Sequence, residues 1–372
     1  MAPRKPTVFT PHFTITTGTA NDLMRIEAAR QSIEVLPITP RVLANLRETA
    51  RLFSTHYSTV IEGNLLTQQQ VVQVIAEGQN FPGREREQNE VLGYYAALDE
   101  VEHLAKTIRS VSELDVQRLH ALVMSAGKKH IRPTPYRDGQ NVIRDSRSKK
   151  IVYMPPEAKD VPGLMRQLVE WINTKDDLPV PLRAAIAHYQ YATIHPYYDG
   201  NGRTARLLTT LILHLRGYGL RGLYALEEYY ARGLQDYYEA LTIGPSHNYY
   251  MGRVEADITK WVAYFIGGMA VSFQKVEAQT RAEASRGGKE MTYALRSLDA
   301  RQRRALILFE QSQEIMAKEV AALFGLKSRA VASLCQGWVQ DGFLVVSRPS
   351  KRTRSYRLAE RYEALFQSRE SL

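Results

Sequence analysis

Cysteine is almost absent from this chain, since Cys335 is the only one among 372 residues. A single cysteine excludes an internal disulfide and any zinc cluster built from several cysteines. We expect Cys335 to be a small buried hydrophobic side chain. Long apolar runs are missing as well, because none approaches the ~18 residues of a membrane-spanning helix. The first residues, Met1-Ala-Pro-Arg-Lys-Pro, lack the pattern of a signal peptide. These absences predict a soluble, cytoplasmic protein without a membrane partner.

The common ATP-binding motifs are absent too. The chain has no G-x-x-x-x-G-K-[ST] loop and no H-R-D set, which excludes P-loop and protein-kinase chemistry. Internal repeats and low-complexity segments are also lacking. What the chain does have is 44% hydrophobic residues and a net charge of +10. Its length suits two or three domains with a real core, and its charge favours anionic partners, ATP first and nucleic acid as an open alternative.

Helical periodicity dominates the pattern of apolar residues. Thr67 and Gln70 have the spacing of a capping box, and Pro40, Pro162 and Pro181 lie near expected helix starts. The first 18 residues, rich in Pro and Thr, are expected to form an extended or poorly ordered arm. The pattern predicts helices near 21–34, 40–56, 67–77, 86–106, 113–126, 161–174, 182–195, 203–216, 224–242 and 253–285.

The one early β signal lies in residues 140–143 and 151–154, which a charged turn separates and Pro155-Pro156 closes. Two short apolar segments around such a turn predict a β-hairpin. An exposed hairpin edge can capture a peptide backbone, although such edges are more often guarded.

The most informative stretch is residues 195–206, His-Pro-Tyr-Tyr-Asp-Gly-Asn-Gly-Arg-Thr-Ala-Arg. Apolar helices are expected on both sides of it. Gly200 and Gly202 let the chain turn and bring backbone N–H groups close to an anion, where the next helix N-terminus adds its positive dipole end. The stretch therefore predicts a nucleotide triphosphate site.

Charged side chains in this stretch support the same interpretation. Arg203 and Arg206 are expected in the first turn of the following helix, where the dipole disfavours cations, so an anion should compensate them. Their planar forks suit phosphate oxygens. Asp199 would repel phosphate unless a divalent cation bridges the two, which favours Mg²⁺. His195 ends the preceding helix and is placed to take a proton from an attacking hydroxyl.

These twelve residues resemble the Fic family motif H-x-F-x-[DE]-G-N-G-R-x-x-R. Tyr197 stands where the family usually has Phe, which affects the packing of the loop. The resemblance implies a protein adenylyltransferase that moves AMP from ATP to a protein hydroxyl (Ser, Thr or Tyr) and releases pyrophosphate. Gly202 favours AMP transfer, because Doc-type relatives that phosphorylate their target tend to carry Lys at that position.

The resemblance also implies a role for each residue of the loop. His195 is the base, Asp199 holds Mg²⁺, and Arg203 and Arg206 bind the β- and γ-phosphates. The predicted hairpin is similar to the family's flap, which docks the target segment by strand addition. The anion hole is formed by Gly200, Asn201 and Gly202.

A second motif lies at residues 58–64, Ser-Thr-Val-Ile-Glu-Gly-Asn, at the end of the helix that begins near Pro40. A carboxylate at a helix C-terminus lies at the wrong end of the dipole, so Glu62 should have a cationic partner. The segment from Ser58 through Glu62 to Gly63 resembles the family's inhibitory motif [ST]-x-x-x-E-[GN]. The resemblance implies self-inhibition, in which Glu62 pairs with Arg206 and displaces the γ-phosphate.

Residues 227–241 resemble the family segment Y-x-x-x-N-R-x-x-Y-Y-x-x-L, in which tyrosines close over the nucleotide. Gly233 and Leu234 replace the usual Asn-Arg pair. Tyr237 and Tyr238 are therefore candidates for ATP binding, with core packing as the alternative. His188 is expected to be a packing residue and not a metal ligand.

The pattern changes after residues 283–289, where a glycine pair precedes a new helical segment. Three helices, at 300–311, 316–324 and 328–341, are followed by two short strands, and this order predicts a winged helix. Lys327, Ser328 and Arg329 would open its recognition helix. Basic residues at 348, 351, 352 and 354 charge the wing. The segment is expected to contact either DNA or protein.

The chain is thus predicted to be mainly α-helical, with a Fic core, a β-hairpin flap and a small winged-helix domain. The predicted parts are an arm with the first helix (1–39), an inhibitory helical region (40–110), the Fic core (111–285) and the winged helix (286–372). Removal of AMP from a modified protein is one alternative activity, and a DNA-binding regulator with a nucleotide-sensing core is another. The target protein is unknown, and self-modification and a homodimer are left open.

Overall fold

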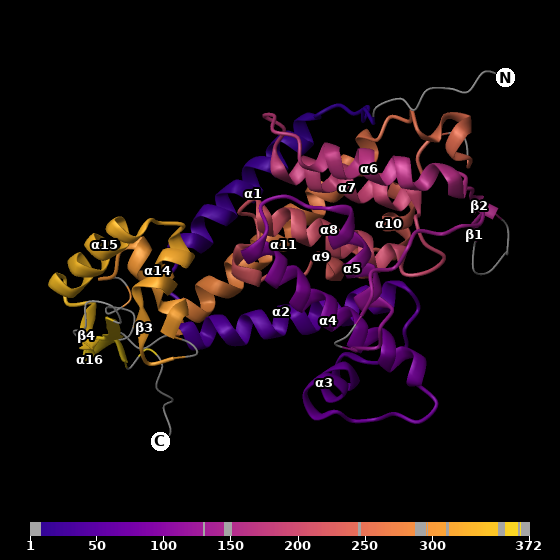
Figure 1. The fold of residues 1–372 in the computed structure, drawn as a ribbon. Helices are drawn as coiled ribbons and strands as arrows, with labels where there is room; N and C mark the ends of the chain where they lie inside the picture. The colour runs from indigo at the N-terminus through magenta and orange to yellow at the C-terminus, as the bar shows by residue number, and fades with distance from the viewer. Residues whose placement is uncertain are drawn as a thin grey trace. The chain divides into compact units, whose positions relative to one another are not determined.

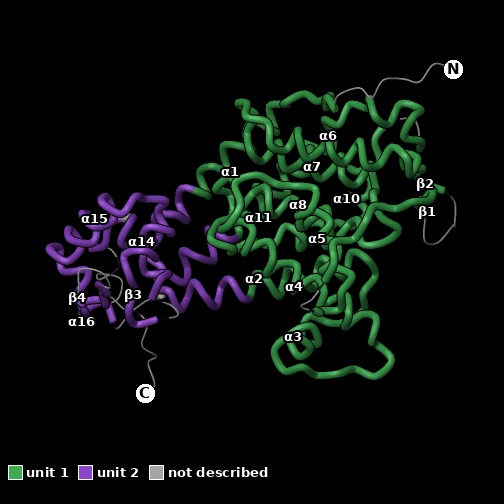
Figure 2. The backbone as a smooth tube through the Cα atoms, in the orientation of Figure 1, with its two compact units in different colours: residues 1–30, 49–275 green, residues 31–48, 276–372 purple. Residues whose placement is uncertain are grey.

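A computed structural model describes residues 9–128, 131–144, 151–244, 247–286, 295, 297–309, 312–348, 354–363 and 365. The chain divides into two compact units, one of residues 1–30 and 49–275 and the other of residues 31–48 and 276–372 (Figure 2). The predicted glycine pair at 287–288 lies outside the described residues, and the division into four parts stays a prediction.

The first unit is mainly helical, which confirms the predicted fold class (Figure 1). Three helices, α1 (Thr17–Val35), α2 (Pro40–Ile61) and α11 (Thr259–Arg286), contribute residues to both units. The other helices of the first unit are α3 (Gln68–Glu77), α4 (Glu85–Thr107), α5 (Glu113–Val123), α6 (Val161–Ile172), α7 (Val180–Ile194), α8 (Asn201–Leu215), α9 (Leu226–Arg232) and α10 (Leu234–Leu241), with short 3₁₀ turns at Ala158–Asp160 and Leu220–Gly222 and a π turn at Tyr249–Arg253.

The centre of this unit is the helix pair α7 and α8, which pack against each other, with α4 and α5 against α8. Almost every residue of α7 is buried. Gly93 allows α4 to approach α5 closely, because a Cβ there would collide with the carbonyl oxygen of Val123. The Trp261 indole donates to the Ala185 carbonyl at 2.7 Å and fixes α11 to α7. The loop between α7 and α8 is therefore held between well-packed helices.

Several local signals act as predicted. Thr67 and Gln70 form a capping box before α3, and Pro40 begins α2. The hairpin is present as β1 (Ile143–Arg144) and β2 (Ile151–Tyr153), paired antiparallel. The charged turn between the strands lies outside the described residues. Along the N-terminal arm, residues 9–16 are not helical, and the Thr14 N–H donates to Thr259 Oγ1 at 2.8 Å.

Several predicted helix boundaries are wrong. The helix expected at 224–242 is two helices, α9 and α10, which break at Gly233 with ψ of 52°, because glycine costs a helix interior about 1 kcal/mol. The helix expected from 253 begins at Thr259, after a turn in which Gly252 has φ of 102°. The helix expected from 203 begins at Asn201. No described helix is long and apolar enough to cross a bilayer.

The second unit holds a small sheet in the order β3-β5-β4, formed by β3 (Ile315–Met316), β4 (Leu344–Arg348) and β5 (Ser355–Leu358). Its core contains Cys335, which is buried as expected. The helix expected at 300–311 is α13 (Ala300–Ala305) followed by a 3₁₀ turn at Leu306–Phe309. The further helices are α14 (Ala317–Phe324), α15 (Ser328–Gln340) and α16 (Glu360–Glu363). The wing residues 349–353 lie outside the described residues, and the winged-helix assignment stays a prediction.

Candidate active site

His195 lies directly after the last residue of α7. Its backbone is left-handed, with φ of 51° and ψ of 60°, and its N–H donates to the Tyr191 carbonyl at 3.0 Å. Burial lowers the pKa of His195 to about 4, although a hydrogen bond with the Ala192 carbonyl opposes this shift. A ring nitrogen that donates to a carbonyl leaves the other nitrogen with a lone pair. The His195 imidazole is therefore neutral across the neutral pH range.

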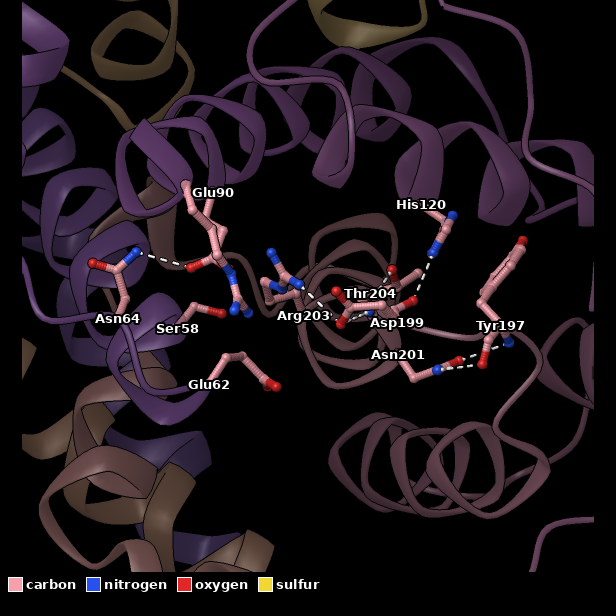
Figure 3. A network of polar contacts seen from close by, with 12 residues as sticks. Ser58, Glu62, Asn64, Glu90, His120, Tyr197, Asp199, Asn201, Arg203 and Thr204 are labelled. Carbon is pink, nitrogen blue, oxygen red and sulfur yellow. Dashed lines mark hydrogen bonds and ion pairs between the residues drawn. The ribbon is translucent and has the colours of Figure 1, made fainter. Parts of the chain in front are cut away.

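The loop after His195 is closed by hydrogen bonds of Asn201. Its side-chain oxygen accepts from the Tyr197 N–H at 3.0 Å, and its amide donates to the Tyr197 carbonyl at 2.8 Å (Figure 3). Gly200 adopts φ of 75° just before α8, and its carbonyl accepts from the Thr204 hydroxyl at 2.9 Å. The expected Gly-rich turn therefore opens directly into a helix N-terminus, where free N–H groups can receive an anion.

Asp199 and Arg203 form an ion pair beside this helix N-terminus. Arg203 Nη2 lies 3.3 Å from Asp199 Oδ1, and the Asp199 side chain is 60% exposed whereas that of Arg203 is 3% exposed. Asp199 Oδ1 also accepts from the Gly200 N–H at 2.6 Å. The second carboxylate oxygen faces no hydrogen-bond donor among the described residues. An exposed carboxylate with a free oxygen fits a magnesium ion that takes its other ligands from phosphates and water.

Arg206 is held by the end of α2. Its Nη2 lies 2.8 Å from Glu62 Oε1, and its Nε donates to the Ser58 hydroxyl at 2.8 Å. A second bond runs from Nη2 to the Ser58 carbonyl at 2.9 Å. Burial opposes the charge of Arg206, but the Glu62 carboxylate helps to raise its pKa above the usual value. The structure thus places Ser58, in the last turn of α2, and Glu62, directly after α2, against the same arginine.

The expectation for the two arginines needs one correction. Because α8 begins at Asn201, Arg203 lies in the first turn but Arg206 lies in the second turn. The dipole penalty falls off within the first turn, so it does not account for a partner of Arg206. Burial explains why Arg206 has a partner, because an arginine whose side chain is only 1% exposed needs polar groups around its guanidinium.

Glu62 also lies against the glycine-rich turn. A Cβ at Gly202 would collide with Glu62 Oε1. The carboxylate thus lies beside the first turn of α8, the same place where an anion is expected. Gly63 follows in a left-handed turn with φ of 89° that ends α2. The inhibitory role of these residues stays a prediction.

The two tyrosines of α10 differ in their surroundings. Tyr237 is 2% exposed, and its hydroxyl lies 3.0 Å from His188 Nε2 in the core. Tyr238 is 47% exposed and donates to the Ile61 carbonyl at 3.1 Å. This arrangement favours core packing for Tyr237, and it makes Tyr238 a contact of the last residue of α2. His188 is a packing residue, as expected, since its other ring nitrogen lies 3.0 Å from the Thr209 hydroxyl.

Sequence reasoning missed the residues that support the loop from outside. His120 of α5 stacks on Tyr197 with ring centroids 3.6 Å apart, and its Nε2 lies 2.9 Å from the Asp199 carbonyl. Arg137 donates to the His195 carbonyl at 3.0 Å. Both residues come from segments far from the motif, and no spacing in the sequence marks them.

A buried carboxylate behind Arg206 was missed as well. Glu227 of α9 is 3% exposed and accepts a hydrogen bond from the Tyr94 hydroxyl at 2.9 Å. Burial raises the pKa of Glu227, while hydrogen bonds and the charge of Arg206 oppose this shift. The only signal in the sequence was the acidic pair at 227–228, which is ordinary for the first turn of a helix.

Comparison with known proteins finds a family match for the part of the chain that contains this loop. Residues 110–213 match the model of the Fic/DOC family. The chain is 35% identical over 178 residues to protein adenylyltransferase fic-1 of Caenorhabditis elegans, covering 46% of this chain and 33% of the relative. It is 30% identical over 203 residues to protein adenylyltransferase Fic of Nematostella vectensis, covering 53% of this chain and 45% of the relative. The chain thus spans less than half the length of these curated relatives.

Solved structures agree with this result over a larger part of the chain. A Fic family protein from Desulfovibrio desulfuricans G20 is similar with a TM-score of 0.59 and 25% identity, covering 95% of this chain and 99% of the other. Fic-1 from C. elegans (residues 134–508) is similar in fold with a TM-score of 0.57 and 24% identity, covering 71% of this chain and 73% of the other. The chain therefore carries a Fic domain.

Proposed function

We propose that this protein is a protein adenylyltransferase that transfers AMP from ATP to a hydroxyl side chain of a protein, its own chain included. The observation that carries the proposal is the neutral imidazole of His195 beside a glycine-rich helix N-terminus with two buried arginines. The names of the curated relatives support the same activity.

The proposed reaction has one displacement step. The target hydroxyl attacks the α-phosphorus of ATP, and the bond from this phosphorus to the oxygen that bridges to the β-phosphate breaks. His195 takes the hydroxyl proton, and pyrophosphate leaves. Because the lone pair of His195 is free at neutral pH, general base catalysis needs no prior deprotonation of the enzyme.

The loop and the first turn of α8 would bind the phosphates. Gly200, Asn201 and Gly202 would form the anion hole once the Gly200 N–H has left Asp199 Oδ1, and Arg203 and Arg206 would neutralise the β- and γ-phosphates. Asp199 would hold Mg²⁺ with ATP, and the bound ion would offset phosphate charge. In the described part of the chain, no three His, Cys, Asp or Glu side chains gather to hold a metal on their own, which fits an ion that arrives with the nucleotide.

Glu62 would restrain this activity. It occupies the guanidinium of Arg206 and lies against Gly202, so a γ-phosphate could take full geometry on Arg206 only after Glu62 withdraws. The alternative activity is removal of AMP, in which Glu62 would position a water molecule. The two activities differ in what happens when the carboxylate is removed, because transfer would rise and removal would fall.

Labelled ATP tests the proposal. The protein is incubated with ATP labelled at the α-phosphate and, separately, at the γ-phosphate. AMP transfer places only the α-label on protein, whereas a kinase would place only the γ-label there. Label that leaves a previously modified protein would favour AMP removal, and no label on protein in either reaction, with Glu62 present or replaced by glycine, would leave a nucleotide-sensing regulator.

Contact with DNA is a second candidate function for the C-terminal unit. Lys327 and Arg329 are exposed at the start of α15, and Arg348 at the end of β4 is exposed too. Exposed basic residues at the start of the third helix of a winged helix suit phosphate contacts. Protein interaction is the alternative role for this surface.

A further inference from the structure

Arg137 is a buried cation between α5 and the hairpin, only 4% exposed. All three nitrogens of its guanidinium donate to backbone carbonyls. Nε donates to His195 at 3.0 Å, Nη1 to Gly139 at 2.9 Å, and Nη2 to Pro156. Its own backbone N–H donates to the Pro196 carbonyl at 2.9 Å. One residue therefore supplies four hydrogen bonds to the surrounding backbone.

The acceptors come from two functional parts of the unit. His195 and Pro196 begin the loop between α7 and α8, whereas Gly139 and Pro156 lie on either side of the hairpin strands β1 and β2. The side chain of Arg137 thus ties both ends of the hairpin to the backbone of the proposed base. Asn141 adds a second link, since its side-chain amide donates to the Tyr197 carbonyl at 3.2 Å and its side-chain oxygen accepts from the Val142 N–H at 2.8 Å.

Stability alone is a weak reason for a charge at this place. Among the described residues, no carboxylate lies within ion-pair distance of Arg137, and an arginine stays charged in proteins. Burying a charge that only carbonyl groups satisfy is costly. The bonds it makes are charge-assisted, and the planar fork fixes the three acceptors in one plane. Such a group is suited to fixing geometry.

The geometry that it fixes is an unusual one. His195 is left-handed, a conformation that costs a non-glycine residue about 1–2 kcal/mol and that the surroundings must enforce. The Tyr191 carbonyl holds the N–H of His195, and Arg137 holds its carbonyl. With both sides of the residue held, the direction of the imidazole is set relative to the hairpin.

We propose that Arg137 is a positioning residue for AMP transfer, which holds His195 in its left-handed conformation and links its position to the hairpin. The inference rests on the proposed function. Without Arg137, ATP should still bind, because the loop bonds of Asn201 and the arginines of α8 do not depend on it. The proton transfer should slow, because small displacements of a base cost orders of magnitude in rate.

The test uses the full chain carrying Glu62→Gly, so that self-labelling gives a signal, with ATP labelled at the α-phosphate. Arg137→Ala should lower the labelling rate at least 100-fold and leave the Kd for ATP within threefold. Arg137→Lys should recover little of the loss, since an ammonium cannot reach three carbonyls in one plane. Arg132→Ala, in the same segment but exposed, is the matched control and should label normally.

Chemical rescue separates positioning from a merely structural role. Guanidinium at millimolar concentration should raise the labelling rate of Arg137→Ala at least tenfold, whereas urea should leave that rate unchanged. Normal labelling by Arg137→Ala would overturn the inference. So would a loss shared by ATP binding and thermal stability that neither guanidinium nor Arg137→Lys relieves. Absence of label in the parent protein would instead count against the proposed function, so the two failures are distinguishable.

Discussion

Replacing Glu62 by glycine should release Arg206 for ATP. The carboxylate contributes one charge-assisted hydrogen bond at 2.8 Å to a guanidinium that is 1% exposed. Such bonds contribute roughly 1.5–3 kcal/mol, and each 1.36 kcal/mol is a factor of ten in rate. If the bond must break before the γ-phosphate binds productively, Glu62→Gly should raise self-labelling by about 10- to 150-fold. Because the Glu62 side chain is 27% exposed, we expect the lower part of this range.

The assay measures initial rates of protein labelling from ATP labelled at the α-phosphate. Glu62→Gln keeps the length of the side chain but removes its charge, so it should recover most of the gain. Arg206→Ala in the Glu62→Gly background should cancel the gain, whereas a general loosening of α2 would not need Arg206. Glu77→Gly is the matched control, because Glu77 is an exposed carboxylate at the end of α3. Unchanged or lower labelling in Glu62→Gly would refute self-inhibition.

Three further predictions follow from the geometry. Burial lowers the pKa of His120 to about 4 and of His188 to about 3, so below pH 6.5 the unfolded chain binds protons that the folded chain does not. As the pH falls from 6.5 to about 4, each of these histidines should therefore lower the free energy of unfolding by up to about 1.4 kcal/mol per pH unit. A melting temperature that stays constant from pH 7 to 5 would contradict this prediction. Tyr238→Phe removes the 3.1 Å hydrogen bond from the tyrosine hydroxyl to the last carbonyl of α2. Because one such hydrogen bond contributes about 0.5–1 kcal/mol, the substitution should raise self-labelling about two- to fivefold. Lower labelling would instead indicate that the hydroxyl binds ATP. In a gel-retardation assay, the full chain should bind duplex DNA more weakly as the salt concentration rises. Lys327→Ala and Arg329→Ala should each lower the slope of the logarithm of the binding constant against the logarithm of the salt concentration by about one. Retardation that does not depend on salt would favour protein interaction.

The loop from 195 to 206 could be predicted from the sequence because its chemistry is contiguous. The turn glycines, the base and the arginines lie within twelve residues, so local rules for turns and helix starts place them together. Glu62 could be linked to Arg206 although 144 residues separate them, because a carboxylate at a helix end needs a cation and the motif resembles an inhibitory one.

Support from distant segments could not be predicted in the same way. Arg137 lies 58 residues before His195, and His120 lies 79 residues before Asp199. Nothing in their neighbourhoods distinguishes them from a surface arginine or a core histidine. Their roles depend on the packing of α5 and the hairpin against α7 and α8, which only the three-dimensional structure shows. The break at Gly233 was missed because periodicity continues across it.

The central claim is that His195 accepts the proton during AMP transfer, and its removal is the most direct test. His195→Ala is compared with the parent, both carrying Glu62→Gly, by labelling from ATP labelled at the α-phosphate and by the Kd for ATP. We predict that labelling is abolished while ATP binding is largely intact, because the phosphates are held by the turn and the arginines of α8 and not by the imidazole. Labelling at the parent rate would contradict the account.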